Sequence, residues 1–392
     1  MSLIGTMSVG IKAPIIKKGD DLINIVCDSV INATNEHNLP LQDRDIVAVT
    51  EAIVAKSQGN FASLDDISAD VREKFGNETV GLILPIQSRN RFSLLLKGIA
   101  NGVGKLVIQL SLPCDEVGNH LVSPEKFMES GVNPYDTITE ADFYRLFGTP
   151  KHEFTGVNYI ELYKSLAGEN SEIIFSNNPC AILNYTKYVI NADIHTRETT
   201  KKQLLQAGAE KVYSLSDILN KSVNGSGYNA EYGLLGSNIS TNDSVKLFPR
   251  DTMKFAFDLQ AEFKKRTGKE IECMVYGDGA FKDPVGKIWE LADPVVSPGY
   301  TDGLIGLPNE IKFKYIADNN LANLSGEEAT KAIIKIIKEK NKDLKNQSVS
   351  LGTTPRRLTD LLGSLSDLTS GSGDKGTPIV LIKNYFKTYA DD

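Results

Sequence analysis

Apolar strand candidates and amphipathic helices alternate along most of this chain, and this alternation constrains its fold more than any other feature. The runs KLVIQLSL, SEIIFS and KYVIN indicate strands, and TRETTKKQLLQAGAEKVYSLSDIL indicates a helix followed by a short strand. Thr196 is the expected cap of that helix and Gly208 its expected end. Repeated strand, helix and strand units favour a parallel sheet covered by helices. We therefore predict an α/β protein with mixed sheets.

The alternation extends to both ends of the chain. An amphipathic helix over about residues 20–35 precedes the strand DIVAVT, residues 45–50, and EAIVAKSQGNF after it is apolar at alternate places. Further on, RDTMKFAFDLQAEFKKRTGKE predicts a helix with Asp251 as N-cap and Gly268 as a left-handed residue at its end. The strand IECMVY, a charged helix and the last strand PIVLIKNY follow.

Length and composition set the class of protein. A chain of 392 residues can bury more than one core, and we expect three parts, over residues 7–104, 105–230 and 231–392. No apolar run reaches the ~18 residues of a membrane span, and no secretory signal begins the sequence. The four cysteines are scattered without a CxxC pair, which favours free thiols in the cytoplasm. A net charge of −7 without basic clusters argues against a nucleic-acid partner.

The stretch MVYGDGAFKDP, residues 274–284, contains the first candidate for chemistry. Asp278 lies between two glycines at the end of a predicted buried strand, where α/β proteins collect ligands. Its carboxylate suits a divalent cation, and the glycines would let phosphate oxygens approach the backbone. The alternative is an Asp-Gly turn in which Asp278 bonds its own backbone.

Other candidates have an equally plain alternative. Lys56, three residues before Gly59, suits a phosphate but also an ordinary surface position. The segment SGSGDKG, residues 370–376, suits a phosphate-contacting loop or a simple linker. His195 is placed for acid-base chemistry or for a helix start.

Several stretches, in chain order, resemble the coenzyme F420:L-glutamate ligase family, also called F420-0:γ-glutamyl ligases. IKAPIIKKGDDL resembles the family's LPLIKEGDDL, and DRDIVAVTEAIVAKSQG resembles GDVLVVTQKIVSKAEG. VKLFPRDTMKFAFDLQAEFKKRTGKEIECMVYGDGAF is similar to the family run that ends in Asp-Thr-x-Gly-Arg, and SGSGDKGTPIVLIKN resembles GEGGDGIPAVVVRG. The resemblance implies a ligase-like fold split by an inserted α/β region, residues 105–230.

The resemblance also implies an activity and its residues. A member would use GTP to activate a carboxylate and join it to the amine of L-glutamate, with Mn²⁺ or Mg²⁺ bridging the phosphates. Asp278 and Gly279 would fall on the metal site. Eleven residues would contact the nucleotide: Ala13, Pro14, Ile15, Ile16, Glu51, Ala52, Lys56, Asn238, Gly371, Gly373 and Gly376.

The chain departs from the family pattern at the metal site. The motif Gly-Ile-Asp-x-Ser-Asn appears as GLLGSN, so Leu235 replaces a metal-binding aspartate while Asn238 is kept. Leucine offers no oxygen to a hard cation. Three acids in polar turns are possible replacements: Asp115, Asp243 and Asp283.

Three functions follow as expectations. The first is a GTP-dependent γ-glutamyl ligase acting on small molecules, cytoplasmic and homodimeric like the family it resembles, or a ligase for another acceptor held by the inserted region. The second is a catalytically silent nucleotide- or metabolite-binding protein of the same fold. The third is a Rossmann-like binding protein that works through VINADIHTRETTKKQLLQAGAEKVY.

Overall fold

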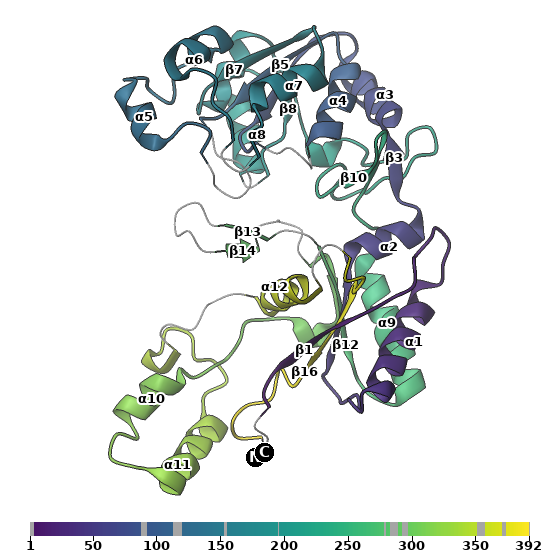
Figure 1. Cartoon of the computed structure of the whole chain (residues 1–392), viewed down its shortest axis with the longest axis vertical. Helices are drawn as coiled ribbons and strands as arrows, with labels where there is room; N and C mark the ends of the chain where they lie inside the picture. The colour runs from purple at the N-terminus through teal and green to yellow at the C-terminus, as the bar shows by residue number, and fades with distance from the viewer. Residues whose placement is uncertain are drawn as a thin grey trace.

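The chain forms two lobes, each built around a sheet, with a small helical unit beside the lower one (Figure 1). The computed structural model describes residues 4–87, 92–112, 120–152, 155–194, 196–277, 280–282, 289–291, 297–350, 357–370 and 374–391.

A five-stranded mixed sheet forms the core of the lower lobe. Its order is β1 (Met7–Ile11), β16 (Ile379–Lys383), β2 (Ile46–Thr50), β12 (Glu272–Tyr276) and β15 (Gly299–Tyr300). Strands β2 and β12 run parallel, and the other neighbours are antiparallel. The first and last described strands of the chain are therefore neighbours in this sheet.

Helices cover both faces of this sheet, so its central strands are buried on both sides. The covering helices are α1 (Leu22–Glu36), α9 (Thr252–Thr267) and α12 (Leu358–Ser370). Val26 and Leu259, from α1 and α9, pack with Val49 in the core of one face. On the other face, Leu362 of α12 packs with Ala48. The alternation of Ala48 and Val49 between the two cores is the period of two expected of a strand.

A six-stranded sheet, parallel except for one edge, forms the core of the upper lobe. Its order is β6 (Ile138–Thr139), β7 (Ser171–Phe175), β5 (Lys105–Leu110), β4 (Thr79–Leu84), β8 (Tyr188–Asn191) and β9 (Lys211–Ser214). Only β6 pairs antiparallel. Strand β4 pairs with β5 and β8, so this sheet begins before residue 105. The expected limits of the three parts of the chain stay predictions.

Helices lie on both faces of the six-stranded sheet as well. They are α3 (Leu64–Phe75), α4 (Ser93–Asn101), α6 (Glu140–Phe147), α7 (Tyr159–Ala167), α8 (Arg197–Gln206) and the short helix η1 (Pro179–Asn184), with α5 (Pro124–Glu129) at the periphery. Ile67, Leu96 and Ile160 of α3, α4 and α7 share one core with Ile108. Leu204 of α8 packs on the opposite face. The sheet is therefore doubly wound.

Two smaller pieces of sheet lie near the junction of the lobes. One is a three-stranded sheet of β10 (Asn238–Thr241), β11 (Ser244–Lys246) and β3 (Phe61–Ser63). The other is the hairpin of β13 (Ala280–Lys282) and β14 (Trp289–Leu291), which lies between the lobes in Figure 1. Helix α2 (Glu51–Gln58) leads from β2 of the lower lobe to β3.

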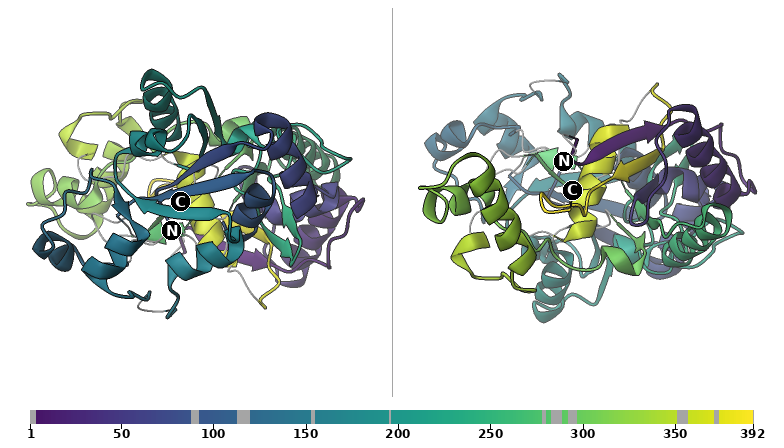
Figure 2. Two further views of the ribbon diagram at one scale, coloured as in Figure 1. Left: turned by 90° about the horizontal axis from the view of Figure 1, so that it is seen from above. Right: turned by 90° about the horizontal axis from the view of Figure 1, so that it is seen from below.

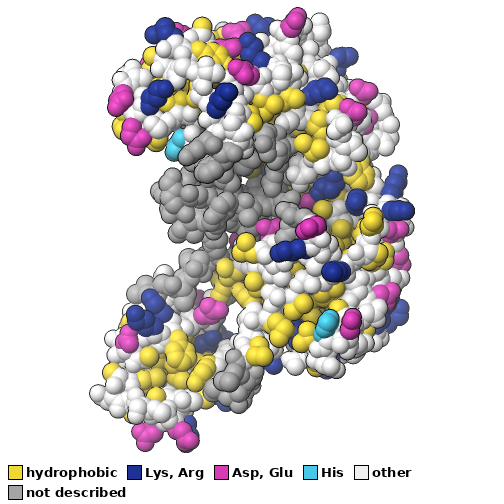
Figure 3. Space-filling model, viewed as in Figure 1, with side chains coloured by type: hydrophobic (Ala, Val, Ile, Leu, Met, Phe, Trp, Pro, Cys, Tyr) yellow, Lys and Arg dark blue, Asp and Glu magenta, His cyan; other side chains and the backbone are white. Residues whose placement is uncertain are grey.

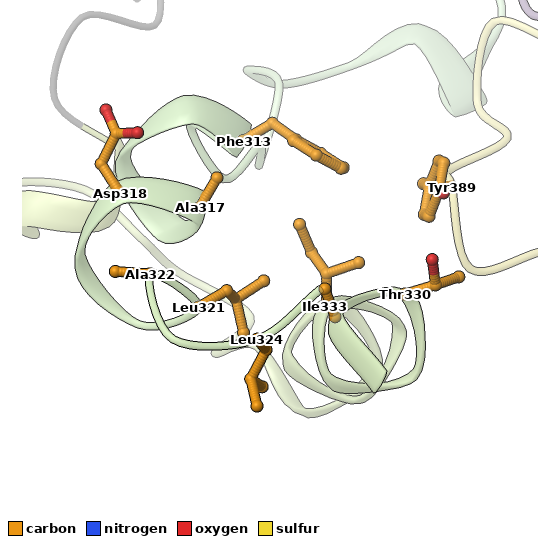
Figure 4. A pocket seen from close by; sticks show the side chains of 10 residues that line it. Phe313, Ala317, Asp318, Leu321, Ala322, Leu324, Thr330, Ile333 and Tyr389 are labelled. Atoms are coloured by element: carbon orange, nitrogen blue, oxygen red, sulfur yellow. The ribbon is translucent and has the colours of Figure 1, made fainter. Parts of the chain in front are cut away.

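The helical unit consists of α10 (Phe313–Asn319) and α11 (Gly326–Glu339) and stands to one side of the five-stranded sheet (Figure 2). Apolar side chains gather on the face of this unit seen in Figure 3. Between its helices and the C-terminal segment lies a cavity of about 560 Å³, lined by Phe313, Leu321, Ile333 and Tyr389 among others (Figure 4). The core of the helical unit contains three buried apolar side chains among the described residues.

The mixed α/β fold predicted from the sequence is confirmed, with one local correction at the start of α9. EAIVAKSQ, which the sequence marks only as apolar at alternate places, forms the helix α2. Asp251 precedes α9 in a left-handed conformation with φ +53°, and its side chain makes no capping hydrogen bond. Gly268 does end α9 in the left-handed conformation, with φ +71°. Within the described residues, no helix is both long and apolar enough to cross a bilayer.

Candidate functional site

One edge of the five-stranded sheet gathers most of the described residues that the sequence nominates. The register aligns Ile11 with Ile379, Ile379 with Val49, and Tyr276 with Thr50. The carboxyl ends of β1, β2 and β12 therefore meet the start of β16 at a single edge. The segments that follow β1 and β2 and the one that precedes β16 all lie there, which is where α/β sheets bind ligands.

The segment after β1 lies against the turn before β16. The backbone N–H of Ala13 donates to the carbonyl oxygen of Gly376 at 3.4 Å. Gly376 has φ +65°, a conformation that suits glycine. Ile16 is buried and anchors the segment, whereas Pro14 is exposed and Ile15 is 83% exposed. Ala13 and Gly376, expected on opposite sides of one nucleotide, are thus neighbours, and an exposed apolar side chain stands beside them.

Glu51 begins α2, and its buried carboxylate forms an ion pair. Lys246 Nζ, from β11, donates to Glu51 Oε1, and only 1% of the Glu51 side chain is exposed. Lys246 is in register with Asn238 of β10. Asn238, the residue of the GLLGSN motif that this chain keeps, therefore lies on the strand beside Lys246. The Lys246 ammonium reaches the edge of the five-stranded sheet at Glu51. A carboxylate at the first turn of a helix is also favoured by the helix dipole.

Ala52 and Lys56 share a face of α2, because they are four residues apart in a helix. Lys56 is exposed in the last turn, and Gly59 ends the helix with φ +63°. The Lys18 side chain packs so closely on Gly59 that a Cβ there would lie 2.4 Å from Lys18 Cδ. The exposed position of Lys56 suits an ammonium that meets solvent or a phosphate.

A hydrogen-bonded cluster fixes the crossing between the lobes, and sequence reasoning missed it. Asn60 is buried; its Nδ2 donates to the Phe248 carbonyl oxygen at 2.7 Å, and its Oδ1 accepts from Tyr228 N at 2.9 Å and from Arg250 Nη1. The guanidinium of Arg250 lies 4.8 Å from the centre of the Tyr228 ring. A lone Asn after a glycine gives no sequence signal for this role.

Tyr232, just before the GLLGSN motif, packs against the core of the upper lobe, with its ring 5.6 Å from that of Phe248. Burial, the hydrogen bond with Glu231 and the charge of Glu231 raise the pKa of Tyr232, while the charge of Arg197 lowers it and Tyr300 raises it further. Arg197 opens α8 at the carboxyl edge of the six-stranded sheet, and Tyr300 belongs to the five-stranded one. The pKa of Tyr232 is thus raised mainly by burial and by Glu231.

Part of the predicted site lies outside the described residues. These positions are Asp278, Gly279, Gly371, Gly373, Asp115, Asp283 and His195. Of the acids considered as replacements, Asp243 is described, and it is exposed at the turn between β10 and β11. Its carbonyl oxygen accepts from Leu64 N at 3.0 Å, at the far end of the hairpin from Asn238. The structure does not bring Asp243 to the edge that holds Glu51.

The described residues do not by themselves fit a divalent cation. Leu235 is 3% exposed and packs in the apolar core of the upper lobe. The Glu51 carboxylate is already paired with an ammonium. Within the described part of the chain, no three His, Cys, Asp or Glu residues are grouped so as to hold a metal ion.

Comparison with known proteins decides the family. A family model described as F420-0:Gamma-glutamyl ligase matches residues 10–384. The chain belongs to the F420-0:gamma-glutamyl ligase family. A coenzyme F420:L-glutamate ligase of Methanosarcina barkeri is 47% identical over 55 residues, which is 14% of this chain and 18% of that protein.

Two further relatives carry the same name. The coenzyme F420:L-glutamate ligase of Methanosarcina acetivorans is 42% identical over 57 residues, 14% of this chain and 19% of that protein. That of Methanothermobacter thermautotrophicus is 34% identical over 83 residues, 20% of this chain and 30% of that protein. The matches thus span less than a third of each of these relatives.

Proposed function

We propose that this chain is a GTP-dependent γ-glutamyl ligase, which forms an amide between an activated carboxylate and L-glutamate. The observation that carries the proposal is the convergence of Ala13, Gly376 and Glu51 on one sheet edge, within a chain matched by the ligase family model over residues 10–384. The relatives named as coenzyme F420:L-glutamate ligases support the choice of L-glutamate and of a coenzyme F420 precursor as substrates.

The proposed reaction consists of a phosphoryl transfer followed by an acyl transfer. The acceptor carboxylate takes the γ-phosphoryl group of GTP, which gives an acyl phosphate and GDP. The glutamate amine then attacks the acyl carbon, the C–O bond to phosphate breaks, and an amide, inorganic phosphate and a proton result. In this proposal Lys56 holds a phosphate as a point charge, the Ala13 to Ile16 segment and Gly376 flank the nucleotide, and Asn238 contacts it.

We also propose that Mn²⁺ or Mg²⁺ assists, with Asp278 as its protein ligand. A bound cation would offset the negative charge that collects on the phosphates. The described residues supply no second carboxylate, so this part of the proposal depends on Asp278. Metal titration of the parent and of an Asp278→Asn variant tests it: equal affinities would remove Asp278 from the site.

The activity is tested with purified chain, GTP, Mn²⁺, L-glutamate and coenzyme F420-0. Mass spectrometry should find the acceptor enlarged by one glutamyl residue, and GDP should accumulate in equal amount. Lys56→Ala should weaken GTP binding, whereas Lys221→Ala, at an exposed lysine paired with Glu73, should not. Absence of both products with the folded parent would reject the ligase.

A catalytically silent nucleotide-binding protein is the second candidate. The burial of Leu235 in the upper core favours it, because that position supplies no oxygen to a cation. Thermal melting with GTP, ATP and GDP, with and without Mn²⁺, separates the two. Stabilisation by GTP that requires Mn²⁺ supports the ligase, and stabilisation independent of Mn²⁺ supports the silent binder.

The assembly and location are further parts of the proposal. We propose a cytoplasmic homodimer that acts on small molecules without a nucleic-acid or membrane partner. Light scattering during size-exclusion chromatography tests the dimer: the 42.9 kDa chain should elute with twice that mass.

A further inference from the structure

Strand β1 leaves one side of its backbone without a partner strand among the described residues. It lies at the end of the five-stranded sheet and pairs there with β16 alone. It has five residues, whereas the other edge strands in the described part of the chain have two to four. In Figure 1 it crosses in front of the rest of its sheet. The outer backbone groups of β1 are therefore open to another strand.

The sequence of β1 lacks the features that usually protect an exposed edge. Natural proteins block such edges with charged side chains, proline, bulges or very short strands. MSVGI, residues 7–11, contains neither a charge nor a proline, and its register with β16 is regular over all five residues. The opposite edge of the same sheet, β15, has only two residues. Strand β1 is thus suited to pairing, whereas β15 is protected by its short length.

A cavity beside β1 can receive the side chains of an added strand. It has a volume of about 470 Å³ and lies between β1 and the second half of α1. Val9 and Ile11 point to this side, because Ile11 packs with Val26 of α1. Ser8 points to the opposite side, where its hydroxyl lies 2.7 Å from that of Thr369 in α12. The apolar part of the lining consists of Val9, Ile11, Ala33, Leu39 and Leu381.

The five residues of β1 are complementary to themselves in antiparallel pairing. Full overlap of two copies places Val9 opposite Val9, at a two-fold axis. Met7 then faces Ile11 on the side of α1, and Ser8 faces Gly10 on the side of α12. Apolar residues thus meet apolar residues, and the two small residues meet each other. A second copy of the same chain therefore fits this edge.

The charges at the two ends of the cavity also match a second copy. Strands β1 and β2 both run antiparallel to β16, so α1 joins the carboxyl end of β1 to the amino end of β2. Lys12 therefore lies at one end of the cavity and Glu36 at the other, and both are exposed. In the antiparallel pairing, Lys12 of the second copy comes opposite Thr6, at the end that holds Glu36. Two-fold symmetry brings these opposite charges together twice.

We propose that a second copy of this chain adds its β1 to this edge, so that the two five-stranded sheets join into one continuous sheet. Paired β1 backbones form its centre, apolar side chains fill the two cavities, and Lys12 of each copy meets Glu36 of the other. This interface belongs to the homodimer proposed above and rests on that proposal, but it needs no turnover.

Disulfide cross-linking of the full chain tests the register. Val9→Cys places two thiols directly opposite each other at the two-fold axis, where their Cβ atoms come within reach of a disulfide. Oxidation with diamide should therefore give a covalent dimer on a non-reducing gel. Ser8→Cys is the matched control, because the two Ser8 positions lie diagonal to each other. It should give no more covalent dimer than the parent, which accounts for the native cysteines.

Sedimentation of a dilution series tests the charges in solution. Lys12→Glu and Glu36→Lys should each raise the dissociation constant of the dimer about tenfold, because each turns both attractive contacts into repulsive ones. The double variant restores opposite charges and should return toward the parent value. Lys187→Glu, at an exposed pair with Glu210 in the upper lobe, changes the net charge as much as Lys12→Glu. It should leave the dissociation constant unchanged.

The possible results separate the interface from the homodimer. A parent that sediments as a monomer at every concentration overturns both, and leaves the edge of β1 to a strand of another protein. A dimeric parent overturns the interface but keeps the homodimer in either of two cases: Val9→Cys cross-links no better than Ser8→Cys, or the single charge reversals have no more effect than Lys187→Glu. Neither result depends on ligase activity, since no measurement requires turnover.

Discussion

At the scale of single residues, the Glu51–Lys246 pair is the feature of the proposed nucleotide edge with the largest energetic consequence. Both side chains are nearly excluded from solvent, with 1% and 10% exposed. A buried ion pair adds little net stability, but removal of one partner leaves an uncompensated charge. The pair also joins α2 to β11, which brings Asn238 to the site. Its integrity therefore affects both folding and geometry.

Lys246→Met should destabilise the chain strongly, by about 3–5 kcal/mol, because Glu51 stays buried without its ammonium. The double variant with Glu51→Gln should recover much of the loss. Urea unfolding of the two single variants and the double variant measures the coupling. Lys221→Met, at an exposed pair with Glu73, is the control and should change stability by less than about 1 kcal/mol. A Lys246→Met effect no larger than this control would contradict the prediction.

The buried thiol of Cys27 should make the free energy of unfolding depend on pH. Burial raises the pKa of its thiol from the ordinary value of 9.0 to about 12. The unfolded thiol loses its proton first, so the folded state binds more protons and stability falls as pH rises from about 9 to about 12. Unfolding free energies measured at about pH 8, 9 and 10 should fall less steeply with pH in Cys27→Ala than in the parent. Identical slopes in both proteins would show that this thiol does not contribute.

At the scale of elements, one helix begins with the cap that its sequence provides, whereas another begins without the capping bond that its sequence suggests. Helix α3 begins with a capping box in which the Ser63 hydroxyl accepts from Asp66 N and the Asp66 carboxylate accepts from Ser63 N. Helix α9 has no such cap, since Asp251 takes a left-handed conformation instead. The start of α3 therefore has a side-chain cap in its own sequence, and the start of α9 does not.

Ser63→Ala should cost about 1 kcal/mol of stability, because it removes the acceptor for an N-terminal amide of α3. Chemical denaturation measures the change. Ser165→Ala, at an exposed serine near the end of α7, is the matched control and should stay within about 0.5 kcal/mol of the parent. If both substitutions have the same effect, the box contributes nothing beyond an ordinary surface serine.

At the scale of the whole molecule, stability is distributed unevenly between the two sheets and the helical unit. The sheets are buried on both faces, whereas α10 and α11 share a core of Ile316, Leu321 and Ile333 beside the cavity of Figure 4. Segments with few buried contacts open at lower free energy than the global value. The helical unit should therefore open separately from the lobes.

Hydrogen exchange followed by mass spectrometry should show this order. Amides over residues 313–339 should exchange well before those of β2, β12 and β5, whose strands are central in their sheets. Ala317→Leu, which adds apolar volume to the lining of the cavity, should slow exchange in α10 and leave β5 unchanged. Equal protection of the helical unit and the central strands would contradict this distribution.

The sequence by itself determined the local elements and the family. The period of apolar residues predicted α1, α9, β2, β12 and β16, because helix and strand periods depend on near neighbours. It also predicted the glycine that ends α9. The motifs that nominated Ala13, Glu51 and Gly376 were readable for the same reason, and the loss of an acid at Leu235 was visible before any coordinates.

Only the tertiary structure decided which sheet each strand joins and which residues meet. A buried strand such as β4 looks the same in either sheet, so its pairing with β5 could not be read from its residues. Glu51 and Lys246 are 195 positions apart, and Asn60 and Arg250 are 190 apart. Contacts at such separations form because packing closes the chain around them, and no local pattern encodes them. Likewise, β1 becomes an open edge only once the order of the five strands is set.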